Sequence, residues 1–135
     1  MTQPRLYLAG PYSQGDTALN VRTIIQAAET ATSMGWIPFV PHLIHLWHLI
    51  SPHTIDFWYA YDIEWLSACQ ALLRLPGASQ GADMEVEAAI RDGLPVFEGV
   101  DNLIEAKVFL EHEEVLRGIF GDKRKPKVMP RYRKH

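Results

Sequence analysis

Two carboxylates, those of Asp62 and Glu85, are the side chains of this sequence best suited to chemistry. They bound the stretch DIEWLSACQALLRLPGASQGADME, which predicts an acid on an aromatic-rich helix, an apolar strand, a glycine loop and a second acid opening another helix. Two carboxylates brought to the same end of a sheet can act on a glycosidic bond, one attacking the sugar carbon while the other handles a hydroxyl or a proton. The pattern therefore favours an enzyme.

Asp62 stands on an apolar helix face, because residues three, four and seven apart share a face. The side chains on that face are Ile55, Trp58, Trp65, Leu66 and Cys69. A carboxylate buried there without a partner would be costly, which points to a functional role. The alternative is that Asp62 lies at the solvent-exposed end of this apolar face or forms a salt bridge.

Glu85 is surrounded by small residues on its side of the next helix. These residues are Gly81, Ala82, Ala88 and Ala89. We therefore expect nothing large to cover the carboxylate, so that a ligand can approach it. We also expect Glu85 in the first turn, where unpaired amides and the helix dipole would hold it anionic, as a carboxylate nucleophile requires. The alternative is a glutamate that only stabilises its own helix. Glu87, in a row with Asp83 and Arg91, is typical of a solvated surface.

Short apolar runs alternate with helical patterns along the chain. We expect strands at 6–9, 37–40, 71–75 and 95–97, and helices at 17–34, 55–70, 81–92 and 101–120, with Asp16 and Asp101 as N-caps. Residues 41–54 fit no clean period, and we expect part of that segment to be helical. The alternation predicts an α/β fold: a small doubly wound, Rossmann- or flavodoxin-like parallel sheet of four to five strands with helices on both faces. A proline in the second strand favours the sheet edge.

Two loops lead toward helix N-termini at the carboxyl end of this sheet, residues 10–16 and 77–81. Ligands of open α/β sheets bind there. Backbone amides in such loops can hold phosphate, with Ser13 and Ser79 as additional donors. Neither loop matches a P-loop or the dinucleotide fingerprint.

Four histidines, His42, His45, His48 and His53, invite a zinc interpretation. Their spacing argues against it, since the first three drift around a helix and no cysteine is close in sequence. We expect neither a metal nor an organic cofactor. Trp47 and His48 are candidates for stacking on a flat base, although a core tryptophan is an equally good interpretation.

The length of 135 residues predicts one domain, 1–121, followed by a basic tail, 122–135. The domain has six basic and 15 acidic residues, and the tail has seven and one. An acidic body without an aromatic–basic stripe argues against nucleic acid as a partner. One cysteine, no signal-peptide pattern and no apolar run long enough for a bilayer predict a cytoplasmic protein without membrane contact.

Three segments in combination resemble the nucleoside 2-deoxyribosyltransferase-like superfamily, which includes 2′-deoxynucleoside 5′-monophosphate N-glycosidases. They are LYLAG at 6–10, DIEWL at 62–66 and SQGADME at 79–85 with the following Ala89. The resemblance covers about residues 4–98, and it is closest to small members with GPYS and PFVPHL segments.

The resemblance implies that Glu85 is the nucleophile, that Asp62 assists beside it and that Tyr7 orients it. Ser79 matches the position that contacts the sugar 5′ group. Transferases carry aspartate there, whereas serine resembles the monophosphate hydrolases. Those hydrolases also have an arginine in the first loop, and GPYSQGD contains none. The residues expected to bind substrate are Gly10, Tyr12, Ser13, Trp47, His48, Ser79 and Gly81.

The expected function is cleavage of an N-glycosidic bond, or base exchange, on a (deoxy)nucleoside or its 5′-monophosphate. The alternatives are a catalytically silent nucleotide-binding module and an interaction protein that uses its basic tail. We also expect at least a homodimer, with the aromatic residues of 47–61 as the contact surface. Base identity, ribose versus deoxyribose, the 5′-phosphate and hydrolysis versus transfer stay open.

Overall fold

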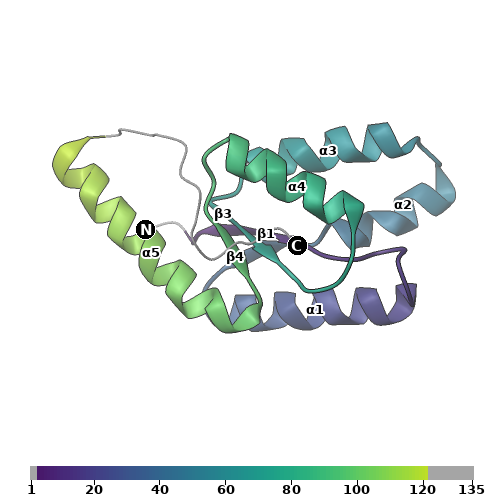
Figure 1. The fold of residues 1–135 in the computed structure, drawn as a ribbon, viewed down its shortest axis with the longest axis horizontal. Helices are drawn as coiled ribbons and strands as arrows, with labels where there is room; N and C mark the ends of the chain where they lie inside the picture. The colour runs from purple at the N-terminus through teal and green to yellow at the C-terminus, as the bar shows by residue number, and fades with distance from the viewer. Residues whose placement is uncertain (1–2, 122–135) are drawn as a thin grey trace.

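A computed structural model describes residues 3–121 (Figure 1). In chain order the elements are β1 (Arg5–Ala9), α1 (Thr17–Ser33), β2 (Ile37–Phe39), a 3₁₀ helix (Pro41–Ile44), α2 (His45–Ile50), α3 (Ile55–Ser67), β3 (Ala71–Arg74), α4 (Gln80–Arg91), β4 (Val96–Glu98), a second 3₁₀ helix (Val100–Asn102) and α5 (Leu103–Phe120). The basic tail expected at 122–135 lies outside the described residues.

The four strands form one parallel sheet in the order β2-β1-β3-β4, which confirms the predicted fold class. β2 is an edge strand, as Pro38 predicted. From the central pair, β1 leads outward through α1 to β2, whereas β3 leads outward through α4 to β4 on the other side. The connections diverge between β1 and β3, and the carboxyl ends of such a pair are where doubly wound sheets bind ligands.

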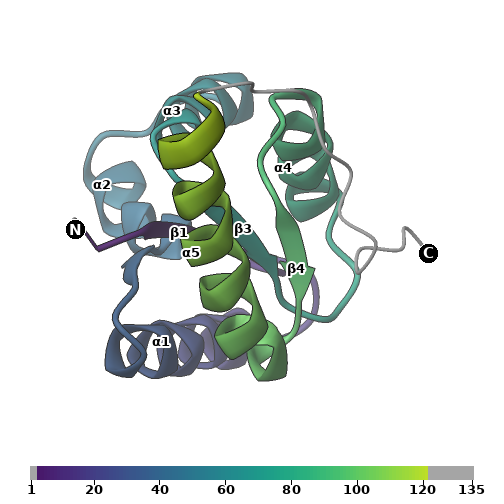
Figure 2. The same cartoon turned by 90° about the vertical axis from the view of Figure 1, so that its left-hand side faces the viewer.

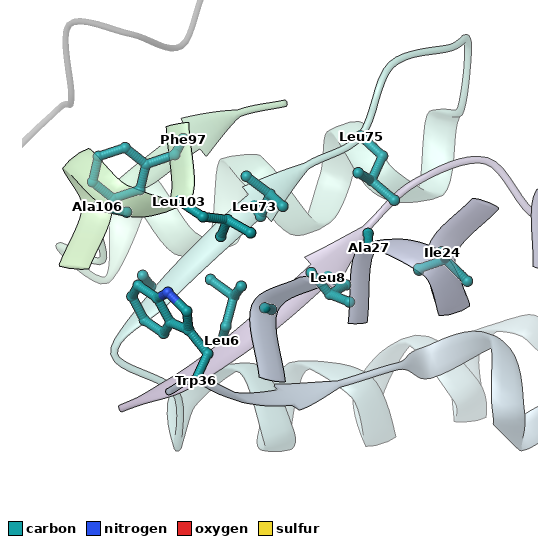
Figure 3. Close-up of a cluster of buried hydrophobic side chains, with 12 residues drawn as sticks. Leu6, Leu8, Ile24, Ala27, Trp36, Leu73, Leu75, Phe97, Leu103 and Ala106 are labelled. Carbon is teal, nitrogen blue, oxygen red and sulfur yellow. The ribbon is translucent and has the colours of Figure 1, made fainter. Parts of the chain in front are cut away.

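Helices cover both faces of the sheet (Figure 2). Successive strand residues point to opposite faces, so Leu6 and Leu73 join the core beneath α1 and α5, while Tyr7 and Leu72 join the core beneath α3 and α4. Figure 3 shows the first core, where the fully buried Trp36 lies beside Leu6. The second core is the one that matters for chemistry, because α3 carries Asp62 and α4 carries Glu85.

The start of α1 follows the prediction and the start of α5 does not. Asp16 caps α1, its carboxylate accepting a hydrogen bond from the Leu19 amide at 3.1 Å. Asp101, expected to cap the last helix, instead lies inside a 3₁₀ turn, and α5 begins two residues later without a side-chain cap. The turn forms because Asn102 donates its side-chain N–H to the Glu98 carbonyl, which folds the chain back before the helix begins.

The segment 41–54 is partly helical, with a 3₁₀ turn running directly into α2. It leaves large apolar side chains exposed around α2 and the start of α3. These are Leu43, Leu46, Trp47, Leu49, Ile50 and Ile55, defined here as the α2 surface. Within residues 3–121, no helix combines the length and the hydropathy needed to cross a bilayer.

Replacing the α1 cap should destabilise the fold, whereas replacing Asp101 should not. Asp16→Ala leaves an amide of the first turn without its side-chain acceptor, and the free energy of unfolding should fall by about 1 kcal/mol. Asp101→Ala serves as the matched control and should change it by less than about 0.5 kcal/mol. Urea unfolding of both variants measures the difference; equal losses would contradict the assignment of the caps.

Candidate functional site

A buried hydrogen bond joins Tyr7 on β1 to Glu85 on α4. The Tyr7 hydroxyl donates to Oε2 of Glu85 between the sheet and the helix. Tyr7 is fully buried and Glu85 is 8% exposed. Tyr7 pairs in register with Leu72, so the site lies over the central strands β1 and β3, two residues below the carboxyl end of β1.

The surroundings of Glu85 pull its pKa in opposite directions. The net result is a pKa of about 8 against an ordinary value of 4.5, because burial, and to a smaller extent the negative charge of Asp62, raise it. The hydrogen bond from Tyr7 and the positive charge of Arg74 both lower it. Burial, followed by the charge of Glu85, raises the pKa of Tyr7 well above 10.0, so the phenol stays a hydrogen-bond donor at neutral pH.

Asp62 approaches the same site from α3. Burial raises its pKa to about 7, and its charge influences both Tyr7 and Glu85. Oδ1 of Asp62 is buried and accepts no hydrogen bond from any described residue. Neither alternative, a solvated carboxylate or one in a salt bridge, describes this oxygen. Two acids whose pKa values lie near neutral pH, and of which one acts electrostatically on the other, can exchange protons with a bound molecule.

Two expectations about Glu85 are wrong. Helix α4 begins at Gln80, so Glu85 is its sixth residue and Asp83 is the acid of the first turn. The dipole therefore does not hold Glu85 anionic; burial favours the protonated acid instead. Nor is the carboxylate uncovered, since Tyr7 packs against it from the strand. The small residues beside Glu85 let α4 approach the sheet closely, which brings the carboxylate down onto Tyr7.

The loops after β1 and β3 meet above this site. A Cβ on Gly77, whose φ is +115°, would lie 2.7 Å from Cγ of Pro11, so the loops touch where glycine leaves room. Gly10 is buried against Leu75, 3.2 Å from where its own Cβ would stand. The loops 10–16 and 77–81, which are far apart in the sequence, thus lie against each other; together they are called the rim below.

The remaining loop residues predicted to bind substrate differ in exposure. Ser13 and Gly81 are exposed, and open space surrounds the position of a Cβ on Gly81. Ser79 caps α4, its hydroxyl accepting a hydrogen bond from the Ala82 amide at 3.1 Å. The Tyr12 ring is half-buried, and its hydroxyl is buried without a hydrogen-bond partner among the described residues.

The histidines each have local partners. Nε2 of His42 donates to the Pro11 carbonyl at 2.7 Å, and the Tyr12 ring packs edge-on against His42 and lies 5.2 Å from that of His45. Nδ1 of His48 accepts a hydrogen bond from the Trp58 indole at 2.7 Å. Across the part of the chain that the structure describes, no three histidine, cysteine or acidic side chains gather as a metal-binding group.

Trp47 and His48 lie between α2 and α3 in a cluster of aromatic rings. The Trp47 ring packs edge-on against Trp58 and Tyr61, with centroids 5.1 and 5.5 Å away. Trp47 is nevertheless 44% exposed. These contacts join α2 to α3, which explains the position of both rings. Stacking of the rings on a base stays a prediction.

Arg74 is a component of the site that sequence reasoning missed. It is the last residue of β3, only 8% exposed, and its guanidinium forms a salt bridge of 3.1 Å with Asp83. Asp83 is therefore paired with the strand instead of standing in a surface row with Glu87. The signal available was a single charge in the apolar run ALLRL, since a buried strand excludes an unpaired charge.

This doubly wound α/β domain, with acids over its central strands, has the architecture of a small-molecule site at the sheet's switch point. The chain belongs to the family described as Domain of unknown function (DUF7768), whose model matches residues 4–98. A comparison with curated proteins finds no match.

Among solved structures, the fold is similar to one titled as a 2-deoxyribosyltransferase from the psychrotolerant bacterium Bacillus psychrosaccharolyticus. The TM-score is 0.51 and the identity 19%, over 70% of each chain. The similarity supports a distant relationship of fold.

The buried acids should make the protein less stable as the pH rises. The pKa of Glu85 in the folded protein lies above its ordinary value. The contribution of this carboxyl to the free energy of unfolding is therefore complete below about pH 4.5 and is lost as the pH rises through about 8. Each pH unit between the folded and unfolded pKa values is worth about 1.4 kcal/mol. When urea unfolding is measured from pH 5 to 9, the free energy of unfolding should fall less steeply with pH in Glu85→Gln than in the wild type. In Glu87→Gln, at an exposed position, it should fall as in the wild type. An unchanged slope in Glu85→Gln would contradict the shifted pKa.

Proposed function

We propose that this protein cleaves the N-glycosidic bond of a (deoxy)nucleoside or its 5′-monophosphate, or exchanges the base, through Glu85 as nucleophile. The observation that carries the proposal is the group of three side chains on one face of the sheet: Glu85, hydrogen-bonded to Tyr7, with Asp62 beside them. The fold similarity to a deoxyribosyltransferase supports the same class of chemistry.

The reaction proceeds in two displacements. A carboxylate oxygen of Glu85 forms a bond to the anomeric carbon while the bond from that carbon to the base nitrogen breaks. The electron pair of the broken bond leaves with the base, which takes a proton from Asp62. Water, or a second base, then attacks the anomeric carbon, its proton passes to Asp62, and the carbon–oxygen bond to Glu85 breaks.

Each residue has a role that its surroundings support. The half-buried Asp62 carboxyl, with a pKa of about 7, holds a proton in much of the protein at neutral pH and can donate it. Tyr7 donates to one oxygen of Glu85 and so orients the other toward the sugar. Ser79 uses its oxygen as a helix cap, which leaves its hydroxyl proton for the 5′ group of the substrate.

The rim supplies the rest of the substrate-binding surface. Gly10, Tyr12, Ser13 and Gly81 belong to the loop after β1 and to the start of α4. The Tyr12 hydroxyl is buried and has no hydrogen-bond partner among residues 3–121, so a polar ligand that displaced its cover would gain a donor there. Trp47 and His48 contribute to base binding only if the base extends over α2.

Base release should depend on Glu85 and show a bell-shaped pH profile. Activity needs Glu85 ionised and Asp62 protonated, and the two acids hold one proton between about pH 7 and 8, where the rate should be greatest. Glu85→Gln should lower the rate by a factor on the order of 10⁴, and Tyr7→Phe by roughly tenfold to a hundredfold.

The assay incubates the protein with a panel of deoxynucleosides, ribonucleosides and their 5′-monophosphates and quantifies free base by chromatography. Glu64→Gln, an exposed acid also on α3, is the control and should keep full activity. A catalytically silent binding module predicts the opposite result: nucleotides raise the melting temperature by mass action and are recovered intact at every pH.

We also propose that the protein is at least a homodimer that pairs through the α2 surface. Exposed apolar side chains concentrated on one short helix and its flanks favour burial against a second copy.

Multi-angle light scattering tests this pairing. Leu46→Glu combined with Ile50→Glu should convert the assembly to monomers, whereas Ile104→Glu, an exposed apolar position on α5, should leave its mass unchanged. A monomeric wild type would overturn the proposal.

A further inference from the structure

Arg74 is a buried cation at the end of a central strand. It pairs in register with Ala9 of β1 and points to the same face of the sheet as Tyr7, toward α4. Because removing an unpaired guanidinium from water is costly, a buried arginine needs partners that satisfy its charge and its N–H groups. Its partners lie in two further segments of the candidate site, the loop after β3 and the start of α4.

The guanidinium binds the loop after β3 and the start of α4 at the same time. Nη1 donates to the Leu75 carbonyl, and Nη2 donates to the Gly77 carbonyl at 2.9 Å and to Oδ1 of Asp83 at 3.1 Å. A lysine ammonium cannot reproduce this fork, since guanidinium offers planar N–H groups in a fixed geometry. Arg74 thus fixes both the rim residue Gly77 and the first turn of α4 to the strand.

The same positive charge acts on Glu85. Three groups on three elements act on that carboxylate: Tyr7 from β1, Asp62 from α3 and Arg74 from β3. Asp83, the anion paired with Arg74, lies two residues earlier on α4. Of these, Arg74 carries the only positive charge, and it opposes both burial and Asp62.

We propose that Arg74 is a positioning residue of the site, whose guanidinium holds the rim and the start of α4 in place and whose charge favours the ionised carboxylate of Glu85. Its consequence for catalysis rests on the proposed function, whereas its effects on Glu85 and on the rim do not. Three of its N–H groups are directed at the Leu75 and Gly77 carbonyls and at Asp83, so we assign Arg74 a positioning role and not a role in contact with the reacting atoms.

Two substitutions separate the charge of Arg74 from its hydrogen bonds. Arg74→Met removes both, and the pKa of Glu85 should rise by about one pH unit. Arg74→Lys keeps the charge, so that pKa should stay near the wild-type value while the melting temperature falls by about 4 °C. Carboxyl ¹³C NMR titration, with the Glu85 signal assigned from Glu85→Gln, measures the pKa, and calorimetry measures the melting temperature.

Arg91→Met removes an exposed arginine from the last turn of α4 and should change neither quantity. If Arg74→Met does not fold, Asp83→Asn replaces it: with the paired anion removed, the charge of Arg74 should lower the pKa of Glu85. The inference is overturned if the pKa is unchanged in a folded Arg74→Met or in Asp83→Asn, or if Arg74→Lys melts like the wild type.

The activity readout is kept apart from these measurements. In base release, Arg74→Met should lower the rate at pH 6 about tenfold, because the ionised form of Glu85 becomes about tenfold rarer there. A wild type without any base release, combined with the expected pKa changes, would refute the proposed function while leaving the role of Arg74 intact.

Discussion

The hydrogen bond from Tyr7 to Glu85 is the constraint on which the rest of this structure depends. It requires a tyrosine on the helix-facing side of a central strand and a helix that approaches that strand closely. The second requirement explains Ala88 and Ala89, both fully buried, on the inner face of α4. Any larger side chain there would lift the helix and separate the two groups, so the packing of the core and the geometry of the acid are set by the same residues.

The site keeps an acid in a place that disfavours its ionisation. Burial has the largest effect on the pKa of Glu85, and among the described residues the Tyr7 donor and the Arg74 cation oppose it. This balance leaves the carboxylate responsive to small changes, since the arrival of a ligand alters both solvation and nearby charge. Asp62 is poised in the same way, with one oxygen that has no partner among the described residues. Groups of this kind occur where proteins perform acid–base chemistry.

The sequence predicted the architecture better than it predicted local detail. Apolar runs separated by glycines define the strands, and Pro38 identified the edge strand because a proline cannot donate to the ladder. The position of Glu85 within its helix was missed, because the helix start depends on a cap made by Ser79 in the folded loop. Arg74 was missed because two of its partners are carbonyl groups, which leave no pattern in a sequence.

The bond from His42 to the Pro11 carbonyl links two regions that are otherwise distinct. The histidine lies in the turn that leads directly into α2, while Pro11 lies in the rim and touches Gly77 on the opposite loop. The turn before α2 and the loop after β1 are therefore joined by a direct hydrogen bond. A second copy that docks on α2, as proposed above, would therefore also restrict the motion of the loop beside the two carboxylates.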